Sequence, residues 1–223
     1  MDAPVFRRVL YVQPQMLGDV LCNTGVLPYL RRALPQATIA YLVRRPFEEV
    51  LAGNGNLDEV IAFQVRGGAW SLYDRVAVIR EVRRRRYDLV IDQTCGTLTA
   101  QIALLSGAPF RLGYADSRRR FAYNLRAARR GERYSAAMKF DLLAPLGIEE
   151  GPYELEFAIT PESQQAADRW LESIGIRPEQ LVCVAPGSKD PRKVWRSASF
   201  ARVCDDVQSS APWRVVLIGA SDE

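Results

Sequence analysis

The segment RVLYV (residues 8–12), followed by LGDVL (residues 17–21), decides the fold of this chain. The first segment is a short apolar run of the kind that forms a buried strand. The second opens a helical pattern and puts a carboxylate, Asp19, in the first turn of that helix. Because parallel α/β sheets bind ligands beyond the carboxyl ends of their strands, we expect Asp19 to lie at a ligand-binding edge.

Strand-like apolar runs and helical patterns alternate along the rest of the chain. Strands are expected at residues 8–12, 38–43, 60–63, 88–92, 110–114, 181–185 and 215–219. Helices are expected at residues 19–34, 46–51, 72–86, 97–106, 134–146, 161–174 and 199–207. The segment 153–157 fits either a connecting segment or an edge strand. Strands that are apolar on both faces and separated by helices predict an α/β fold with a buried parallel sheet.

The alternating pattern restarts at about residue 155, which predicts two domains, residues 1–154 and 155–223. The second has only two clear strands, whereas an average sheet has roughly five, so we expect an incomplete domain in a fragment of a longer protein.

Charge is also distributed unevenly between the two predicted domains. Residues 1–149 contain 22 basic and 14 acidic side chains, and residues 150–223 contain 8 and 12. This asymmetry indicates different partners for the two domains.

The composition is that of an ordinary soluble protein, with 48% apolar and 25% charged residues. No apolar run is long enough to span a membrane and no signal peptide is visible, so the expected compartment is the cytoplasm. The chain lacks histidine and has no C-x-x-C pair, which argues against a zinc site and against an imidazole base. We expect four buried, reduced thiols, at Cys22, Cys95, Cys183 and Cys204.

A second notable turn follows a predicted strand late in the chain. It contains Gly187, Ser188 and Lys189, and Lys193 comes shortly after. Exposed backbone N–H groups and two ammonium groups suit phosphate oxygens, although a solvated basic loop explains these residues as well. For Asp19, the competing interpretation is a carboxylate that only stabilises the start of its helix. Neither turn matches the P-loop or the G-x-G-x-x-G motif, so a dinucleotide cofactor is not predicted.

Three segments together resemble a known family. They are LGDVLCNTGVLPYLRRALPQATIAYLVRRPFEEVLAGNGNLDEVI (17–61), YDLVIDQTCGTLTAQIALLSGAPFRLGY (87–114) and VAPGSKDPRKVWRSASFARV (184–203). In this order they resemble glycosyltransferase family 9, the bacterial lipopolysaccharide heptosyltransferases. The resemblance implies a GT-B architecture, with two Rossmann-like domains and an active site between them. Residues 1–154 would form the acceptor-side domain, and residues 155–223 the start of the nucleotide-sugar-binding domain.

The resemblance also implies a chemistry. The reaction would be an inverting, metal-independent transfer of a heptose from ADP-heptose to the lipid-linked inner core (Kdo-lipid A or a heptosyl acceptor), without a cofactor. The family's general base falls on Asp19, and its phosphate-contacting lysine falls on Lys193, beside Gly187, Ser188 and Lys189. The residues agree with this chemistry. Inversion needs one carboxylate to deprotonate the acceptor hydroxyl, and positive charge to stabilise the departing diphosphate.

Arginines concentrate between residues 111 and 133, where eight of them occur with two acids. Guanidinium groups suit the phosphates of lipid A and the carboxylates of Kdo, so we expect Arg118, Arg119 and Arg120, together with Gly18, to bind the acceptor. The same surface would rest on the anionic inner face of the cytoplasmic membrane. Nucleic acid is the rival partner, but neither a recognition helix nor a stacking platform favours it.

The chain departs from the family pattern in three places. Asn23-Thr24-Gly25 replaces Thr-Thr-Pro, a common histidine near residue 136 is missing, and the acidic donor loop would lie beyond residue 223. We therefore expect weak or no transferase activity from these 223 residues alone. Two alternatives remain open: a family member that uses another nucleotide sugar, and a non-catalytic basic binding module. Asp19→Ala distinguishes a transferase from the binding module. A transferase should lose turnover while it keeps its fold and donor affinity, whereas a binding module should be unaffected.

Overall fold

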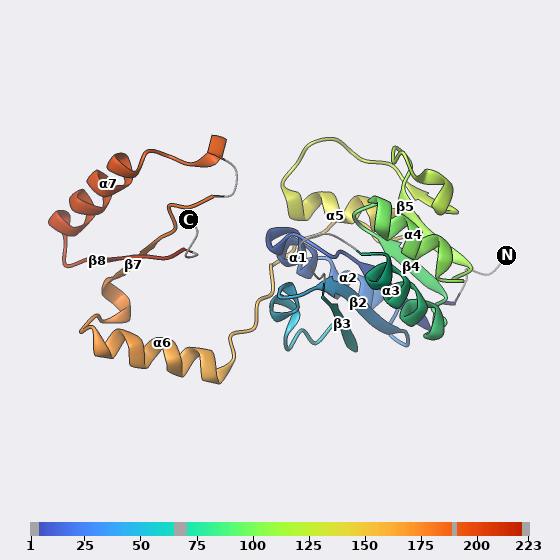
Figure 1. Cartoon of the computed structure of the whole chain (residues 1–223), viewed down its shortest axis with the longest axis horizontal. Helices are drawn as coiled ribbons and strands as arrows, with labels where there is room; N and C mark the ends of the chain where they lie inside the picture. Colours follow the sequence, from blue (N-terminus) through green and yellow to red (C-terminus); the bar gives the residue numbers. More distant parts are fainter. Residues whose placement is uncertain (1–4, 65–70, 189–190, 220–223) are drawn as a thin grey trace. The chain divides into compact units, whose positions relative to one another are not determined.

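The structure is a computed structural model that describes residues 5–64, 71–188 and 191–219 (Figure 1). Its contacts divide the chain into two units, the first ending at Ala158 and the second beginning at Ile159. The boundary expected from the sequence, between residues 154 and 155, lies slightly earlier. Among the described residues, no helix is both long enough and apolar enough to cross a bilayer.

A six-stranded parallel sheet with the strand order β3-β2-β1-β4-β5-β6 forms the centre of the first unit. The strands are β1 (Arg8–Val12), β2 (Thr38–Arg44), β3 (Glu59–Phe63), β4 (Leu89–Asp92), β5 (Phe110–Tyr114) and β6 (Leu125–Ala127). The central strands β1 and β4 are paired so that Val9 lies beside Leu89 and Val12 beside Asp92. Apart from Arg8, both strands are fully buried. The expected parallel α/β sheet is therefore confirmed, and its strand order is that of doubly wound folds.

Helices cover both faces of this sheet (Figure 1). They are α1 (Leu17–Thr24), α2 (Leu27–Ala33), α3 (Leu72–Arg84), α4 (Thr97–Leu105) and α5 (Ser135–Leu143), with the 3-10 turns η1 (Phe47–Leu51), η3 (Arg120–Ala122) and η4 (Ala144–Leu146). Helix α3 packs on α4, whereas α1 packs on α2 and α5. Local signals fix several helix ends. Ser71 and Asp74 form a capping box at α3, and Gly147 ends η4 with a φ of 74°, a left-handed conformation that favours glycine.

The expectation of one helix over residues 19–34 is wrong, because α1 and α2 are separate helices. Pro28 lies in the first turn of α2, and its missing N–H prevents a continuous helix through this point. Gly25 lies between the two helices, where a connecting segment passes closely. A Cβ atom on Gly25 would lie 3.4 Å from the carbonyl oxygen of Glu154.

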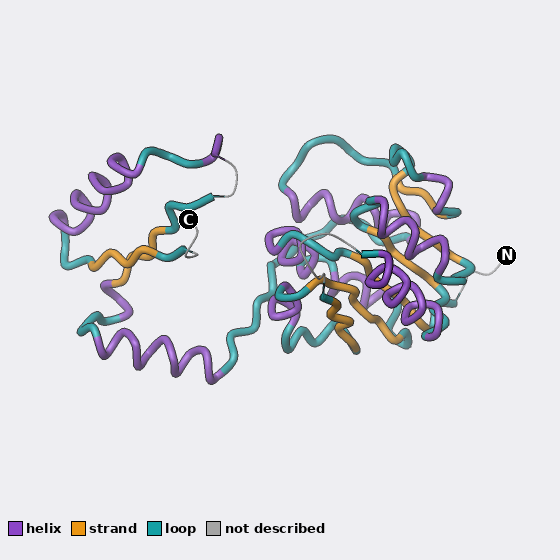
Figure 2. The backbone as a smooth tube through the Cα atoms, in the orientation of Figure 1, coloured by secondary structure: helices purple, strands orange, loops and turns teal. Residues whose placement is uncertain are grey.

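The segment 153–157 is a connecting segment without strand pairing, drawn as loop in Figure 2. Polar contacts attach it to the first unit. The Glu156 N–H donates to Thr24 Oγ1 at 2.8 Å, and Asn54 Nδ2 donates to the Glu156 carboxylate at 2.8 Å. Because the Glu156 N–H donates to a side chain and not to a neighbouring strand, the alternating pattern of this segment does not produce a strand.

The second unit has its own small parallel sheet. It contains α6 (Pro161–Ser173), β7 (Leu181–Val184), α7 (Ser197–Ser210) and β8 (Arg214–Leu217), with the 3-10 turns η5 (Pro178–Gln180) and η6 (Pro191–Lys193). Strands β7 and β8 pair in parallel and are joined through α7, which makes a βαβ unit. Thr160 caps α6 by accepting a hydrogen bond from the Ser163 N–H at 3.2 Å.

The four cysteines are free, as expected, but they are not all buried. Cys95 is buried, Cys22 and Cys204 are half-buried, and Cys183 is exposed. Burial raises the pKa of the Cys95 thiol to about 11, so this thiol stays protonated at neutral pH. The expectation of a buried thiol is wrong for Cys183, because the side chains of β7 are only partly covered.

Replacing Gly113 by alanine should destabilise the first unit by about 1–3 kcal/mol, because it overpacks β5. A Cβ atom on Gly113 would lie 2.5 Å from ring atoms of Tyr123, and that ring is fixed by a 2.6 Å hydrogen bond from its hydroxyl to Asp92. Urea unfolding measures the loss. Gly55→Ala is the matched control, since nothing lies within 4 Å of the added atom. Equal stability of the two variants would contradict this packing.

Candidate functional site

Asp19 lies at the carboxyl edge of the sheet, on the helix that follows the central strand β1. It is the third residue of α1, where the helix dipole favours a carboxylate. Its side chain remains 42% exposed. Helix α1, which follows β1, and helix α4, which follows β4, lie on opposite faces of the sheet. In doubly wound folds, this reversal opens a crevice between the carboxyl ends of the two strands. The sequence thus predicted correctly that Asp19 lies at the edge where such sheets bind ligands.

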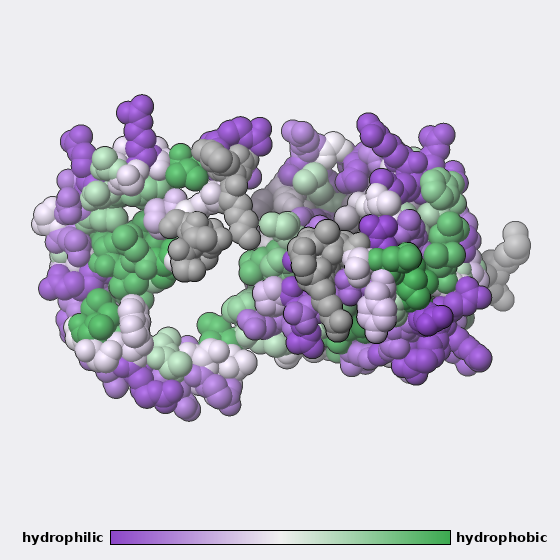
Figure 3. All heavy atoms as spheres, viewed as in Figure 1, coloured by the Kyte–Doolittle hydropathy of each residue, from purple (hydrophilic) through white to green (hydrophobic). Residues whose placement is uncertain are grey.

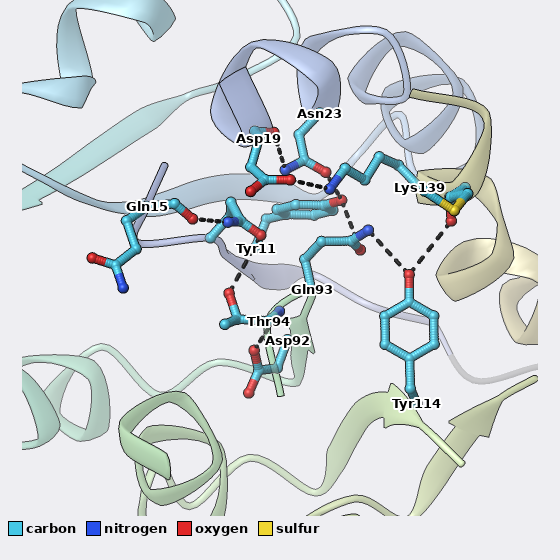
Figure 4. A network of polar contacts seen from close by, with 11 residues as sticks. Tyr11, Gln15, Asp19, Asn23, Asp92, Gln93, Thr94, Tyr114 and Lys139 are labelled. Atoms are coloured by element: carbon cyan, nitrogen blue, oxygen red, sulfur yellow. Dashed lines mark hydrogen bonds and ion pairs between the residues drawn. The ribbon is translucent and has the colours of Figure 1, made fainter. Parts of the chain in front are cut away.

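A lysine from a distant helix contacts the Asp19 carboxylate. Lys139 on α5 places its Nζ atom 2.8 Å from Asp19 Oδ1 (Figure 4). The lysine is buried, with only 8% of its surface exposed. An ammonium group that is removed from water needs a partner, and the carboxylate supplies one. One oxygen of Asp19 is therefore engaged in an ion pair while the side chain stays accessible to solvent.

The main chain of Asp19 is fixed as well, through a buried amide. Asn23 Nδ2 donates to the Asp19 carbonyl oxygen at 2.8 Å, and Asn23 Oδ1 accepts from the Tyr11 hydroxyl at 2.7 Å. Tyr11 and Asn23 are fully buried. Burial raises the pKa of Tyr11 well above its usual value, so the phenol remains a neutral donor. Asp19 is thus held at its backbone by α1 and β1, and at its side chain by α5.

Further polar side chains lie on the β4 side of the same edge (Figure 4). Gln93 Nε2 donates to the Tyr114 hydroxyl at 3.1 Å, and Thr94 Oγ1 donates to Gln13 Oε1 at 3.3 Å. Burial raises the pKa of Tyr114 to about 12, which keeps it neutral. Gln13 and Gln93 are buried, whereas Thr94 is exposed. These uncharged groups fill the space between the ends of β1 and β4.

Asp92, at the end of β4, has a structural role. Its carboxylate is fully buried and accepts hydrogen bonds from the Tyr123 hydroxyl at 2.6 Å and the Cys95 N–H at 2.9 Å. Burial raises the pKa of Asp92, although these hydrogen bonds oppose the shift. Because it is shielded from solvent, Asp92 is not a competing candidate for a base at this edge.

The residues predicted to bind an acceptor differ in their surroundings. Gly18 is exposed, and nothing lies within 4 Å of a Cβ atom placed on it, so a ligand can approach its backbone. Arg119 donates to Thr97 Oγ1 at the start of α4. Arg118 and Arg120 are exposed. The contact with Thr97 places Arg119 at the carboxyl edge of the sheet. The acceptor role of Gly18 and the three arginines stays a prediction.

The residues predicted to contact phosphate belong to the second unit. Gly187 and Ser188 are half-buried in the loop after β7, and Lys193 is exposed at the end of η6. Lys189 lies outside the described residues. Asp19 and Lys193 are on different units, so their meeting across a common cleft stays a prediction. Within the described ranges, no group of three histidine, cysteine or acidic residues could hold a metal ion.

Lys139 was not among the site residues predicted from the sequence. A signal was available, because only three of the chain's 30 basic residues are lysines: Lys139, Lys189 and Lys193. Lys139 is also the only lysine of the first unit, within a largely apolar helix. What the sequence does not contain is the partner, since 120 residues separate Lys139 from Asp19.

A comparison with known protein families identifies the chain. Residues 75–223 match the model of glycosyltransferase family 9 (heptosyltransferase). The chain belongs to glycosyltransferase family 9. No curated protein sequence matches it.

Solved structures of this family are similar to the chain over nearly its whole length. A family 9 glycosyltransferase from Veillonella parvula DSM 2008 matches 97% of the chain with a TM-score of 0.86 and 26% identity. E. coli ADP-heptose lps heptosyltransferase II matches 96% with a TM-score of 0.72 and 18% identity. E. coli heptosyltransferase WaaC with ADP-2-deoxy-2-fluoro heptose matches 96% with a TM-score of 0.72 and 17% identity. The expected GT-B fold class is therefore confirmed. The chain spans 63%, 65% and 70% of these three proteins, respectively.

Asp19→Ala should lower the free energy of unfolding by roughly 1–3 kcal/mol, because it leaves the buried Lys139 ammonium without its partner. Asp19→Asn should cost less, since the amide oxygen can still accept from the lysine. Urea denaturation measures both variants. Asp116→Ala is the control, because it removes an exposed ion pair with Arg129 that contributes little. If Asp19→Ala is no more destabilising than Asp116→Ala, the buried ion pair does not exist in solution.

Proposed function

We propose that this protein is an inverting glycosyltransferase in which Asp19 is the general base. The observation that supports this most is that Asp19 is both accessible and held in place. Its carboxylate lies at the ligand-binding edge of a doubly wound sheet, is 42% exposed, and is fixed through both its side chain and its carbonyl group. A base must be reachable by substrate and held in one orientation, and Asp19 meets both conditions.

The proposed reaction needs one proton acceptor and one site for negative charge. Asp19 takes the proton of an acceptor hydroxyl while the hydroxyl oxygen attacks the anomeric carbon of the donor sugar. The bond from that carbon to the diphosphate oxygen breaks, and the diphosphate leaves with its electron pair. Lys193 and the backbone N–H groups of Gly187 and Ser188 stabilise this charge without a metal ion, and Lys189 assists them.

We further propose ADP-heptose as the donor and the lipopolysaccharide inner core as the acceptor. Family membership supports a heptosyl donor, and the solved structure of E. coli heptosyltransferase WaaC, which has the same fold, is one with ADP-2-deoxy-2-fluoro heptose. Another nucleotide sugar is the alternative. Comparing ADP-heptose with other nucleotide sugars as donors separates the two, because the preferred donor should give the highest kcat/KM.

We also propose that the arginine-rich side of the first unit rests on the inner surface of the cytoplasmic membrane. Figure 3 shows hydrophobic side chains gathered over α3 and α4 with hydrophilic ones around them. Phe121 is 69% exposed directly after Arg118–Arg120, and together with Leu104 it lines an apolar cavity of about 200 Å³. Exposed apolar groups bordered by guanidinium groups are typical of surfaces that bind anionic lipid.

The base assignment is tested with Asp19→Asn in the full-length gene product. Turnover of ADP-heptose with a Kdo-lipid A acceptor should fall by about 10²–10⁴-fold, because the amide cannot accept the hydroxyl proton. Donor affinity, measured by calorimetry, should stay within about twofold, since the donor phosphates are bound elsewhere. A non-catalytic binding module would instead show no turnover in the wild type. Unchanged turnover in the variant would exclude Asp19 as the base.

The membrane assignment is tested by vesicle sedimentation of the 223-residue chain. Binding to vesicles with 30% anionic lipid should exceed binding to neutral vesicles, and the double variant Arg118→Glu/Phe121→Ser should lose most of it. Arg32→Glu on α2, at the opposite face of the sheet, is the matched control for charge. Tight retention of RNA without lipid binding would contradict the proposal and favour a nucleic-acid partner.

A further inference from the structure

We propose that Lys139 is a positioning residue for the base. It holds one oxygen of Asp19 so that the other faces the acceptor hydroxyl. This inference rests on the proposed function, because it assigns Lys139 a role in the same reaction. Lys139 itself is too buried, at 8% exposure, to contact a substrate. It can act only through the carboxylate that it binds.

The division of the two carboxylate oxygens is the first support. Oδ1 accepts from Lys139 Nζ at 2.8 Å, and within the described part of the chain Oδ2 accepts no hydrogen bond. A freely rotating carboxylate would present either oxygen in many directions. Contact with an ammonium group removes this freedom.

The rigidity of the helix that bears Lys139 is the second support. On α5, the adjacent Phe140 packs edge-to-face on Tyr29 with ring centroids 4.9 Å apart. Asp141, which is 1% exposed, forms an ion pair with Arg133, and its carboxylate also accepts from the Arg130 N–H at 3.0 Å. Lys139 therefore projects from a well-anchored backbone, and its ammonium position is set by packing rather than by the mobility of a surface side chain.

The choice of lysine is the third support. The chain contains 27 arginines and three lysines, yet the cation beside Asp19 is a lysine. A guanidinium fork tends to bind both oxygens of a carboxylate, whereas an ammonium group is a compact point charge that can bind one. Lysine thus leaves one oxygen for the substrate, which arginine at this place would engage.

Two single variants and a matched control test the inference in the full-length gene product. Lys139→Met should lower kcat about 10–100-fold while the donor KM stays within about twofold, and Lys139→Arg should recover only part of kcat. Arg85→Met is the matched control, because it removes the ion pairs that Arg85, at the end of α3, forms with Glu59 and Glu81. It should lower the melting temperature but leave kcat within about twofold. If Lys139→Met does not fold, Lys139→Gln takes its place, because it keeps a donor without the charge.

A double-variant cycle separates positioning from general stabilisation. If Lys139 acts through Asp19, Lys139→Met should add no further loss of kcat to Asp19→Asn. A purely structural lysine would lower kcat equally in both backgrounds, and that result would overturn the inference. So would full activity of Lys139→Met. Failure of the proposed function gives a different result: the wild type shows no turnover, or Asp19→Asn alone keeps full turnover.

Discussion

The ion pair between Asp19 and Lys139 is the interaction on which the candidate site depends. It joins α1 and α5, which are separated by five of the six strands in sequence and meet on one face of the sheet. The sheet order makes the meeting possible, because β1 lies at the centre and α1 begins at its carboxyl edge. Without the pair, α5 would bury an ammonium group without a partner and α1 would present a carboxylate with no fixed direction.

Most of the sheet could be predicted from the sequence, because strands buried on both faces are continuous apolar runs with helices between them. Asp19 could be placed for the same local reason. The short strand β6 escaped prediction, since it is only Leu125–Ala127, contains an arginine, and exists through its pairing with β5. Lys139 escaped because its role is defined by a partner 120 residues away, which no local pattern encodes.

In the second unit, the local pattern predicts the elements but not a binding site. The turn with Gly187 and Ser188 follows β7, as its pattern indicates, and the β7–α7–β8 unit repeats the construction of the first sheet. A phosphate site, however, needs hydrogen-bond donors from several segments of the chain. The distance between such a site and Asp19 depends on how the two units are arranged. Family membership is the reason to propose one shared site for these residues, because neither turn alone indicates it.

The most direct test is a structure of the full-length gene product with a non-transferable ADP-heptose analogue and an acceptor. We expect Asp19 Oδ2 to lie within about 2.6–3.2 Å of the attacking hydroxyl oxygen, with Lys139 still bound to Oδ1. An acceptor hydroxyl directed to another base, with the Asp19 carboxylate outside hydrogen-bond reach of both substrates, would contradict it.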